Sequence, residues 1–243
     1  MKSISNITLA TMLSIFFFAS CETKSNEINN DLASDTELID AENISIADQS
    51  LIGLAANQVV PGDVTETDIE HLLYMLEEEK LAHDVYVYFN GKFNKRVFQN
   101  ISKSEAVHQK AIIYLINLFG VEAPDSKPAG EFHNPELQAL YTKLITEAET
   151  LEDALKAGAL IEEVDIMDLK KAISETENEN IKRVFSNLLQ ASGYHLKAFV
   201  KNLSVRGIDY QPQFLSQEEF NTILENSRSN RKSSSHKPTT RCS

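Results

Sequence analysis

Hydrophobic residues recur at the spacing of an α-helix in four long segments of the chain. The segments run from about Glu66 to Asn90, Lys103 to Phe119, Thr150 to Ile173 and Ser174 to Leu203. Each opens with a helix-start signal: Thr67 with Glu70, Ser102, Thr150 with Asp153, and Ser174 with Glu177. No strand-like alternation of any length appears in the sequence. The pattern therefore predicts an all-α protein, most simply a four-helix bundle.

Two shorter helices are predicted beside the four long ones. Asn134-Pro135-Glu136 begins a helix that ends near Glu147, and Ser216-x-x-Glu219 begins another near the C-terminus. The first of these lies in the long connection between the second and third long helices. We interpret that connection as a crossover segment of the bundle.

The two ends of the chain differ in composition from the predicted bundle. We expect a lipoprotein signal peptide at 1–20, an acidic flexible tether at 21–63, the helical domain at 64–226 and a basic, Ser-rich disordered tail at 227–243. The tether is rich in Asn, Asp, Ser and Glu and has few aromatic residues. Such a segment cannot bury enough hydrophobic surface to fold alone.

The predicted signal peptide has a charged Lys2, a short apolar run and the small residues Ala19 and Ser20 directly before Cys21. This order is typical of a lipobox, in which cleavage precedes a cysteine that then carries lipid. A plain secretory signal or a transmembrane helix is the alternative, but the apolar run is short for about 30 Å of hydrocarbon. We expect an exported protein, anchored to the bacterial cell envelope and its membrane through lipid on Cys21.

Charge and cysteine content narrow the classes of partner and of fold. The chain has a formal net charge of -13, which argues against nucleic acid or an anionic lipid surface as a partner. It contains 2 cysteines, Cys21 and Cys242. With one of them lipidated, no internal disulfide framework can form, so the domain must be stabilised by its core.

Ionisable residues interrupt the hydrophobic stripe of every long helix, near its middle. They are Glu79 in the first helix, Glu105 and His108 in the second, Glu162 and Asp165 in the third, and His195 in the fourth. An isolated buried charge would cost several kcal/mol, so these groups must be paired, neutralised or metal-bound. Carboxylates and imidazoles that converge from four helices suit a pair of iron or manganese ions.

Each candidate ligand also has a structural interpretation. Glu105 can complete a capping box with Ser102. His108 or His195 alone would more often be a hydrogen-bonded core histidine than a metal ligand, and Asp165 can bond to a neighbouring helix. The metal interpretation is favoured because all four helices carry the anomaly at a matching depth.

Other polar residues of these helices are expected to serve different roles. Glu77, Glu78 and Glu163 are read as solvated surface residues. Tyr86 shares the face of Glu79, where it can hydrogen-bond a ligand, act as a redox neighbour or simply pack with its hydroxyl satisfied.

Four motifs together resemble the ferritin-like family known as domain of unknown function 2202. They are Glu-Lys-Leu-Ala-x-Asp-Val-Tyr at Glu79–Tyr86, Ser-Glu-x-x-His-Gln at Ser104–Gln109, Gly-Ala-Leu-Ile-Glu-Glu-x-Asp-Ile at Gly158–Ile166, and Leu-Leu-x-x-Ser-x-x-His-Leu-x-Ala-Phe at Leu188–Phe199. The resemblance covers roughly residues 68–203. It implies a ferritin-like bundle akin to the rubrerythrins.

The resemblance also implies roles for the candidate ligands. Carried over, Glu79 is the first-helix ligand, Glu105 and His108 are the second-helix pair, Glu162 is the bridging acid of the third helix, and His195 is the fourth-helix histidine. One departure is evident, because a typical di-iron site has a second Glu-x-x-His and Ser192 stands three residues before His195. Asp165 could supply the missing carboxylate; otherwise the site would hold one metal ion or none.

Two functions from different classes follow from these expectations. One is a dimetal oxidoreductase of the ferroxidase or peroxidase type, acting on Fe(II), peroxide or dioxygen. Because the chain has no Cys-x-x-Cys site, its electron donor would be external. The other is a non-catalytic envelope scaffold or binding protein with a polar core. The sequence leaves the oligomeric state open, with a homodimer among the allowed states.

Overall fold

The computed structural model describes residues 62–233, with the side chains of 226–233 excepted. This part of the chain contains helices and no strand: α3 (Glu66–Phe93), α4 (Arg96–Phe119), α5 (Pro135–Glu147), α6 (Leu151–Glu175), α7 (Glu179–Val205) and α8 (Gln217–Ser233). The all-α prediction is therefore confirmed. The expected signal peptide, Cys21, nearly all of the tether and the end of the tail lie outside the described residues.

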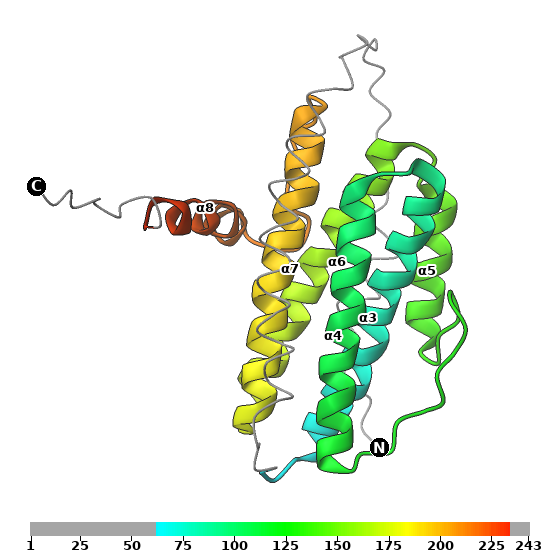
Figure 1. Cartoon of the computed structure of the whole chain (residues 1–243), viewed down its shortest axis with the longest axis vertical. Helices are drawn as coiled ribbons and strands as arrows, with labels where there is room; N and C mark the ends of the chain where they lie inside the picture. The colour runs from blue at the N-terminus through cyan, green and yellow to red at the C-terminus, as the bar shows by residue number, and fades with distance from the viewer. Residues whose placement is uncertain (1–61, 234–243) are drawn as a thin grey trace, which may run out of the picture.

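The four long helices α3, α4, α6 and α7 pack as a bundle, with α5 against its side (Figure 1). α3 and α4 form one antiparallel hairpin, and α6 and α7 form another. The connection between the hairpins, residues 120–150, runs back along the outside of the bundle and contains α5 (Figure 1). α8 projects away from α7. The crossover predicted between the second and third long helices is thus present.

Side-chain caps fix the starts of several helices at or near the predicted residues. Thr65 forms a capping box with Asp68 at α3, and Thr150 forms one with Asp153 at α6. α5 has the predicted cap, since the Asn134 side chain accepts hydrogen bonds from the first-turn amides. The cap of α3 is thus Thr65, two residues before the expected Thr67, while the helix itself begins at the predicted Glu66.

Two other helix starts were predicted wrongly. α4 begins at Arg96, so Ser102 lies inside the helix, where its hydroxyl donates to the Gln99 carbonyl at 3.1 Å. A capping box between Ser102 and Glu105 is thereby excluded. Ser174 likewise lies within α6, and Asn178 caps α7. At the C-terminus, α8 continues past residue 227, where we expected the tail to begin.

A layer of buried polar side chains divides the core into two hydrophobic clusters. On α3, Leu72 and Met75 belong to one cluster and Val85 and Phe89 to the other, with Glu79 between them. On α4 and α7 the two clusters likewise lie on either side of the buried ionisable residues. The bundle therefore places its ionisable groups at mid-height, with hydrophobic packing above and below.

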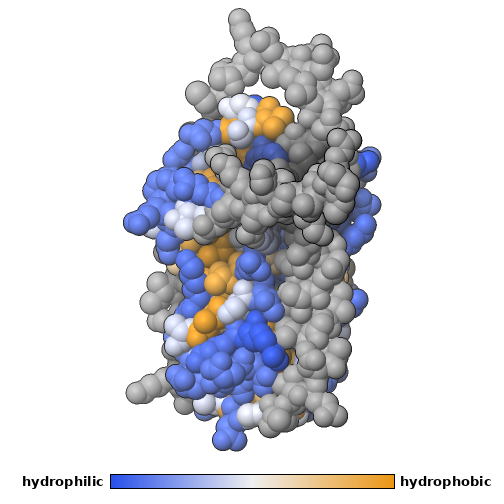
Figure 2. Space-filling model, turned by 60° about the vertical axis from the view of Figure 1, so that its left-hand side comes forward, coloured by the Kyte–Doolittle hydropathy of each residue, from blue (hydrophilic) through white to orange (hydrophobic). Residues whose placement is uncertain are grey.

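The surface of the described residues is mostly hydrophilic. Figure 2 shows one face, on which a narrow hydrophobic strip is bordered by hydrophilic side chains. The large hydrophobic residues classed as exposed are Val87, Tyr88, Ile113 and Val205. None of the helices in the described part of the chain is both long and apolar enough to span a membrane.

Candidate metal centre

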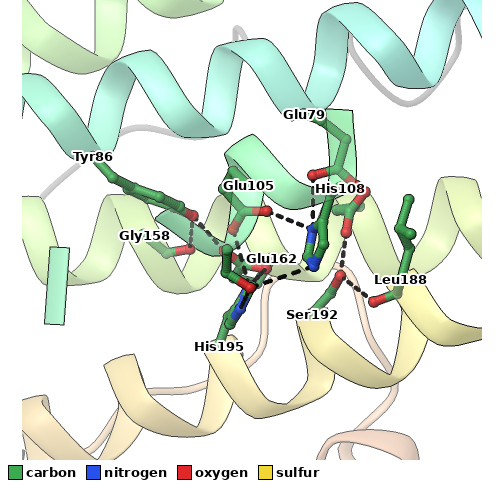
Figure 3. Close-up of polar contacts among 11 residues, drawn as sticks. Glu79, Tyr86, Glu105, His108, Gly158, Glu162, Leu188, Ser192 and His195 are labelled. Carbon is green, nitrogen blue, oxygen red and sulfur yellow. Dashed lines mark hydrogen bonds and ion pairs between the residues drawn. The ribbon is translucent and has the colours of Figure 1, made fainter. Parts of the chain in front are cut away.

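All six predicted ligands lie inside the bundle at the polar layer. Their exposed fractions are 2% for Glu79, 2% for Glu105, 0% for His108, 2% for Glu162, 6% for Asp165 and 0% for His195. They come from α3, α4, α6 and α7, and their side chains converge between these helices (Figure 3). Because these residues lie in the middle of long helices, the site is held by regular backbone rather than by loops.

One group of possible ligands consists of Glu79, Glu105 and His108. The His108 Nδ1 atom lies 2.7 Å from Glu105 Oε2 and 3.1 Å from Glu79 Oε2. One ligand atom from each of the three residues lies within 4.8 Å of the other two. Glu105 and His108 reach this point together because residues three apart on a helix share one face.

The second group consists of Glu105, Glu162 and His195. The His195 Nδ1 atom lies 2.9 Å from Glu105 Oε1 and 3.4 Å from Glu162 Oε2. The two histidine rings stack with their centroids 5.5 Å apart. Glu105 belongs to both groups, and each of its oxygens faces one histidine. A carboxylate in this position can bridge two metal ions.

Several ligand atoms in the centre lack a hydrogen-bond partner. Glu79 Oε1, Glu105 Oε1, Asp165 Oδ1 and His195 Nδ1 are buried and accept or donate no hydrogen bond within the described structure. Glu105 Oε1 and His195 Nδ1 lie 2.9 Å apart, yet their alignment does not make a hydrogen bond. Buried polar atoms without partners are costly, so this arrangement fits a centre that binds cations.

The charges of the metal-free centre are set by burial and by the neighbouring ligands. Burial raises the pKa values of Glu79, Glu162 and Asp165. Burial also opposes ionisation of Glu105, but His195 and His108 outweigh it and lower the pKa of that carboxyl. For His195, burial lowers the pKa, while Glu105 and Glu162 raise it to about 10. Without metal, protons therefore supply the positive charge that these carboxylates require.

Asp165 and Ser192 lie together beside the two groups. The Ser192 hydroxyl donates to Asp165 Oδ2 and to the Leu188 carbonyl oxygen (Figure 3). Ser192 stands where a second Glu-x-x-His would place its glutamate. The structure therefore brings the Asp165 carboxyl next to that position, and Asp165 stays a candidate auxiliary ligand.

Ser104 is a site residue that was not predicted from the sequence. Its buried hydroxyl lies 3.1 Å from His195 Nε2 and 3.4 Å from His108 Nε2. It therefore fixes the outward nitrogens of both rings while their Nδ1 atoms face the carboxylates. The available signal was a polar residue one turn before His108 on the same stripe.

Tyr86 orients Glu162 from the neighbouring helix. Its hydroxyl donates to Glu162 Oε1 at 2.6 Å and lies 3.4 Å from the Gly158 carbonyl oxygen (Figure 3). Its ring packs on Phe199, with centroids 5.2 Å apart. Burial and the nearby Glu162 raise the pKa of Tyr86 well above its usual value. The phenol therefore stays protonated and remains a donor.

Two glutamates that were expected on the surface are buried. Glu78 is 4% exposed, and Glu163 is 0% exposed. Glu163 accepts a hydrogen bond from the Tyr210 hydroxyl at 2.6 Å and others from backbone amides of 213–215. It therefore binds the segment that leads to α8, a contact far away in sequence. The surface prediction is wrong for both residues.

Glu77 is the third glutamate that was expected on the surface. It is half-buried and accepts hydrogen bonds from the backbone amides of His133 and Asn134. It fixes the end of the crossover segment on α3. None of these three glutamates belongs to the two groups of possible ligands.

Known proteins similar to this chain share its domain. The uncharacterised protein MJ0754 of Methanocaldococcus jannaschii is 42% identical over 166 residues, which cover 68% of this chain and 90% of that protein. The crystal structure of the hypothetical protein MJ0754 from Methanococcus jannaschii is similar in fold, with a TM-score of 0.68 and 40% sequence identity. The match covers 70% of this chain and 98% of the crystallised one.

A family profile also matches the bundle. It carries the description "Uncharacterized protein domain (DUF2202)" and matches residues 68–227, which include every candidate ligand. The matched region is more than half of the chain and contains nearly all of the four long helices. On this evidence the chain belongs to the DUF2202 family.

Proposed function

We propose that this chain is a ferritin-like metalloprotein that binds a pair of iron or manganese ions at the polar layer of its bundle and uses them in redox chemistry. The observation that carries the proposal is the sharing of Glu105 between two buried groups of ligands, each with its own histidine and its own second carboxylate. Two ions joined by one carboxylate account for this symmetry more simply than two unrelated core histidines do.

The chemistry of the donor atoms supports the choice of metal. The candidate ligands offer carboxylate oxygens and imidazole nitrogens and no thiolate. Such oxygen-rich, mixed sites suit iron and manganese better than soft ions such as Cu(I). The unpartnered atoms of Glu79, Glu105, Asp165 and His195 would gain partners from bound cations.

Each ligand has a distinct role in this proposal. His108 and Glu79 would hold one ion, His195 and Glu162 would hold the other, and Glu105, which belongs to both groups, would serve both. The resemblance had suggested Glu162 as the bridging acid; the shared position of Glu105 favours Glu105 instead. Asp165 supplies an auxiliary carboxylate, which Ser192 keeps in place by its hydrogen bond.

The protein's own side chains prepare the site for redox chemistry. When bound, a pair of iron or manganese ions could pass electrons from Fe(II), or from another external donor, to peroxide or dioxygen. Tyr86 holds Glu162 in place, and Ser104 holds both imidazoles. The hydrophobic clusters on either side exclude bulk water. An external donor would supply electrons.

Metal analysis tests the proposal directly. The purified protein, loaded with Fe(II) without oxygen or with Mn(II), should hold two ions for each chain by elemental analysis. Glu105→Gln removes the bridging charge and should reduce the content of both ions. Glu70→Gln changes an exposed residue of α3 and should leave the content unchanged. Wild-type protein that folds and binds neither metal would refute the proposal.

A scaffold without metal is the second candidate function. It is favoured by the internal pairing of the centre, because His108 and His195 both approach carboxylates within 3.4 Å. In that case the histidines and protonated carboxyls form a hydrogen-bonded core, and the surface of the bundle binds a partner. Metal content, with assays of Fe(II) oxidation and of peroxide reduction, separates the two functions.

We also propose that this domain is held at the cell envelope by lipid on Cys21. The order of Lys2, an apolar run and Ala19-Ser20-Cys21 supports this location. The acidic segment that follows would keep the bundle away from the membrane surface.

A further inference from the structure

The hairpin of α3 and α4 carries local positive charge on a strongly acidic chain. The chain as a whole has 36 acidic residues against 23 basic ones. The stretch from 85 to 104 nevertheless contains no acidic residue, and its basic residues are Lys92, Lys95, Arg96 and Lys103. This stretch includes the turn that joins the two helices at one end of the bundle (Figure 1).

The outer face of α4 continues this charge along the helix. Arg96, Lys103 and Lys110 are exposed and follow one another at intervals of seven residues, so they lie on one stripe of the helix. None of the three forms an ion pair with another residue in the described part of the chain. The acidic residue of α4 is Glu105, which is buried in the candidate centre. This basic stripe is therefore not neutralised by neighbouring acids of its own helix.

Exposed hydrophobic side chains lie at the same level of the hairpin. Val87 and Tyr88 on α3 are 49% and 39% exposed. The contact between the candidate ligands of α3 and α4 sets the register of this antiparallel pair. Because both helices rise equally per residue, that register places Val87 level with the part of α4 between Arg96 and Lys103. Hydrophobic side chains bordered by charged ones are typical of a surface that binds another protein.

Aromatic rings connect this face with the interior of the bundle. The Tyr88 and Phe89 ring centroids are 5.9 Å apart, and those of Phe89 and Phe98 are 5.5 Å apart. Phe98 lies 6.4 Å from Tyr86 between ring centroids, and the Tyr86 hydroxyl donates to Glu162 at 2.6 Å. Electron tunnelling weakens steeply with distance and with gaps in packing. This series of contacts is therefore a packed route for electrons between the exposed face and the candidate centre.

We propose that Val87, Tyr88 and the basic stripe of α4 form a docking face for a small acidic protein that carries one electron at a time. The inference rests on the proposed redox function and names the class of its external donor. In each encounter one electron leaves the carrier, which is oxidised, and reduces one Fe(III) of the iron-loaded protein to Fe(II). Opposite charges attract the carrier, and a small hydrophobic area suits a short-lived complex.

Binding to the metal-free protein tests the docking face without the centre. Isotope-labelled protein is titrated with oxidised flavodoxin, a small acidic FMN protein, and backbone amide shifts are recorded by NMR. The shifts should change mainly within residues 87–103, and binding should weaken as NaCl is added. Arg96→Gln combined with Lys103→Gln should weaken binding by about tenfold at low salt, because charges at the edge of an interface steer association.

A matched substitution of arginine at the other end of the bundle serves as the control. Arg183 is exposed near the start of α7, and this end of α7 adjoins the residues before α3 through the bond from Asn178 to the Asp63 carbonyl oxygen. Arg183→Gln removes the same charge as Arg96→Gln and should leave flavodoxin binding unchanged.

Electron transfer to the iron-loaded protein tests what the docking face does. Flavodoxin hydroquinone is mixed with Fe(III)-loaded protein in a stopped-flow spectrometer without oxygen, and formation of the blue FMN semiquinone is followed. The double variant should slow the second-order rate by about tenfold at low salt, and high salt should reduce the difference. Val87→Glu, which adds a negative charge to the face, should also slow it. Val87, Arg96 and Lys103 are exposed, so these variants should fold and hold as much iron as wild type.

The outcomes separate the docking face from the centre. Wild-type binding and rates in the double variant would overturn the docking face and leave an iron-loaded centre intact. Shifts at residues 87–103 with phosphatidylglycerol vesicles and none with flavodoxin would also overturn it, and would assign this face to the membrane. Wild-type protein that binds flavodoxin and holds no iron would refute the proposed function and, with it, the delivery of electrons through this face.

Discussion

Neighbouring glutamates on α6 face different parts of the molecule and have different partners. Glu162 points into the centre, where it meets His195 and the Tyr86 hydroxyl. Glu163 points toward the segment before α8 and accepts hydrogen bonds from Tyr210 and from successive backbone amides. The first carboxylate therefore faces the other candidate ligands, whereas the second is held by hydrogen bonds from the segment before α8.

Substitution of these two glutamates should therefore separate metal binding from folding. Glu162→Gln should abolish stoichiometric iron or manganese and bring the melting temperature close to that of the metal-free protein. Glu163→Gln should retain the metal and lower the free energy of unfolding by about 2–4 kcal/mol, because charge-assisted hydrogen bonds to buried groups are lost. Elemental analysis and urea unfolding measure the two effects.

The opposite distribution of effects would contradict this assignment. If Glu163→Gln lost the metal in its folded form, or if Glu162→Gln retained both ions, the ligand set would have to be revised.

Gly158 is required by the close packing of α6 against α7. A Cβ atom at this position would lie 2.6 Å from the Phe199 ring, which is fully buried and contacts Tyr86. Gly158→Ala should therefore destabilise the fold by about 1–3 kcal/mol through overpacking, offset by up to about 1 kcal/mol from the helix propensity of alanine.

The same substitution should also disturb the site, since Phe199 supports the tyrosine that orients Glu162. Thermal unfolding and the visible spectrum of Co(II)-loaded protein measure both consequences. A variant as stable as wild type would show that the ring moves freely and that the close contact is unimportant.

At the scale of elements, hydrophobic periodicity predicted the long helices and capping signals misplaced some of their ends. Ser102 resembles a cap in the sequence, but Val97 and Phe98 before it are buried in the core and extend α4 toward α3. The turn between these helices uses Asn94 with φ of 50°, a left-handed conformation that asparagine tolerates. A capping signal in the sequence does not reveal that hydrophobic contacts of Val97 and Phe98 favour a longer α4.

The candidate ligands were predictable because each breaks a hydrophobic stripe on its own helix. Glu78 and Glu163 were not, because they lie off that stripe and are buried by other elements. Glu163 is covered by the segment before α8, which lies about fifty residues away along the chain. Contacts of this kind depend on tertiary packing, so a single-helix pattern cannot reveal them.

The crossover segment is fastened to α3 by Lys80 and Asp84. Lys80 Nζ donates to the carbonyl oxygens of Pro128 and Glu131, and Asp84 Oδ2 accepts from the Gly130 amide at 2.9 Å. Burial raises the pKa of Asp84, but hydrogen bonds from His83, Lys80 and the Gly130 amide outweigh it and lower the pKa below the usual value.

A lowered pKa makes this fastening sensitive to acid. The contribution of Asp84 should be complete above about pH 6, where an unfolded aspartate is ionised, and should be lost as pH falls through the lowered folded pKa. Asp84→Asn should cost about 1–3 kcal/mol at pH 7 and progressively less toward pH 3. Urea unfolding of both proteins across this range measures the difference, and a difference independent of pH would contradict the assignment.

At the scale of the whole molecule, the N-terminal segment decides where the bundle works. We expect Cys21→Ser to release the protein from membranes or to leave it unprocessed, because several acyl chains are needed for stable anchoring. Cys242→Ser, which changes the other cysteine, should leave membrane attachment intact. Membrane fractionation and intact mass report the result. Unchanged fractionation and mass in Cys21→Ser would rule out lipid on this residue.

The polar layer couples the two hydrophobic halves of the core, so metal binding should stabilise the whole domain. All four long helices contribute candidate ligands, and a metal ion bound only to the native state would stabilise it by mass action. At a free metal concentration of about 100 times the Kd, the gain is about 2.7 kcal/mol. Calorimetric unfolding should show a single transition both with and without Mn(II), and Mn(II) should raise its midpoint temperature.

The interaction of His195 with the neighbouring carboxylates predicts that metal binding releases protons. Glu105 and Glu162 raise the pKa of His195 to about 10 in the metal-free centre, despite the opposing effect of burial. A metal ligand must be a neutral imidazole, so His195 loses its proton when metal binds. As pH rises toward this raised pKa, the apparent affinity for Mn(II) should increase by about tenfold per pH unit for every proton that is released. Titration calorimetry with Mn(II) in two buffers of different ionisation enthalpy counts those protons. Equal heats in both buffers would show that no proton is displaced, and would place the metal elsewhere than on His195.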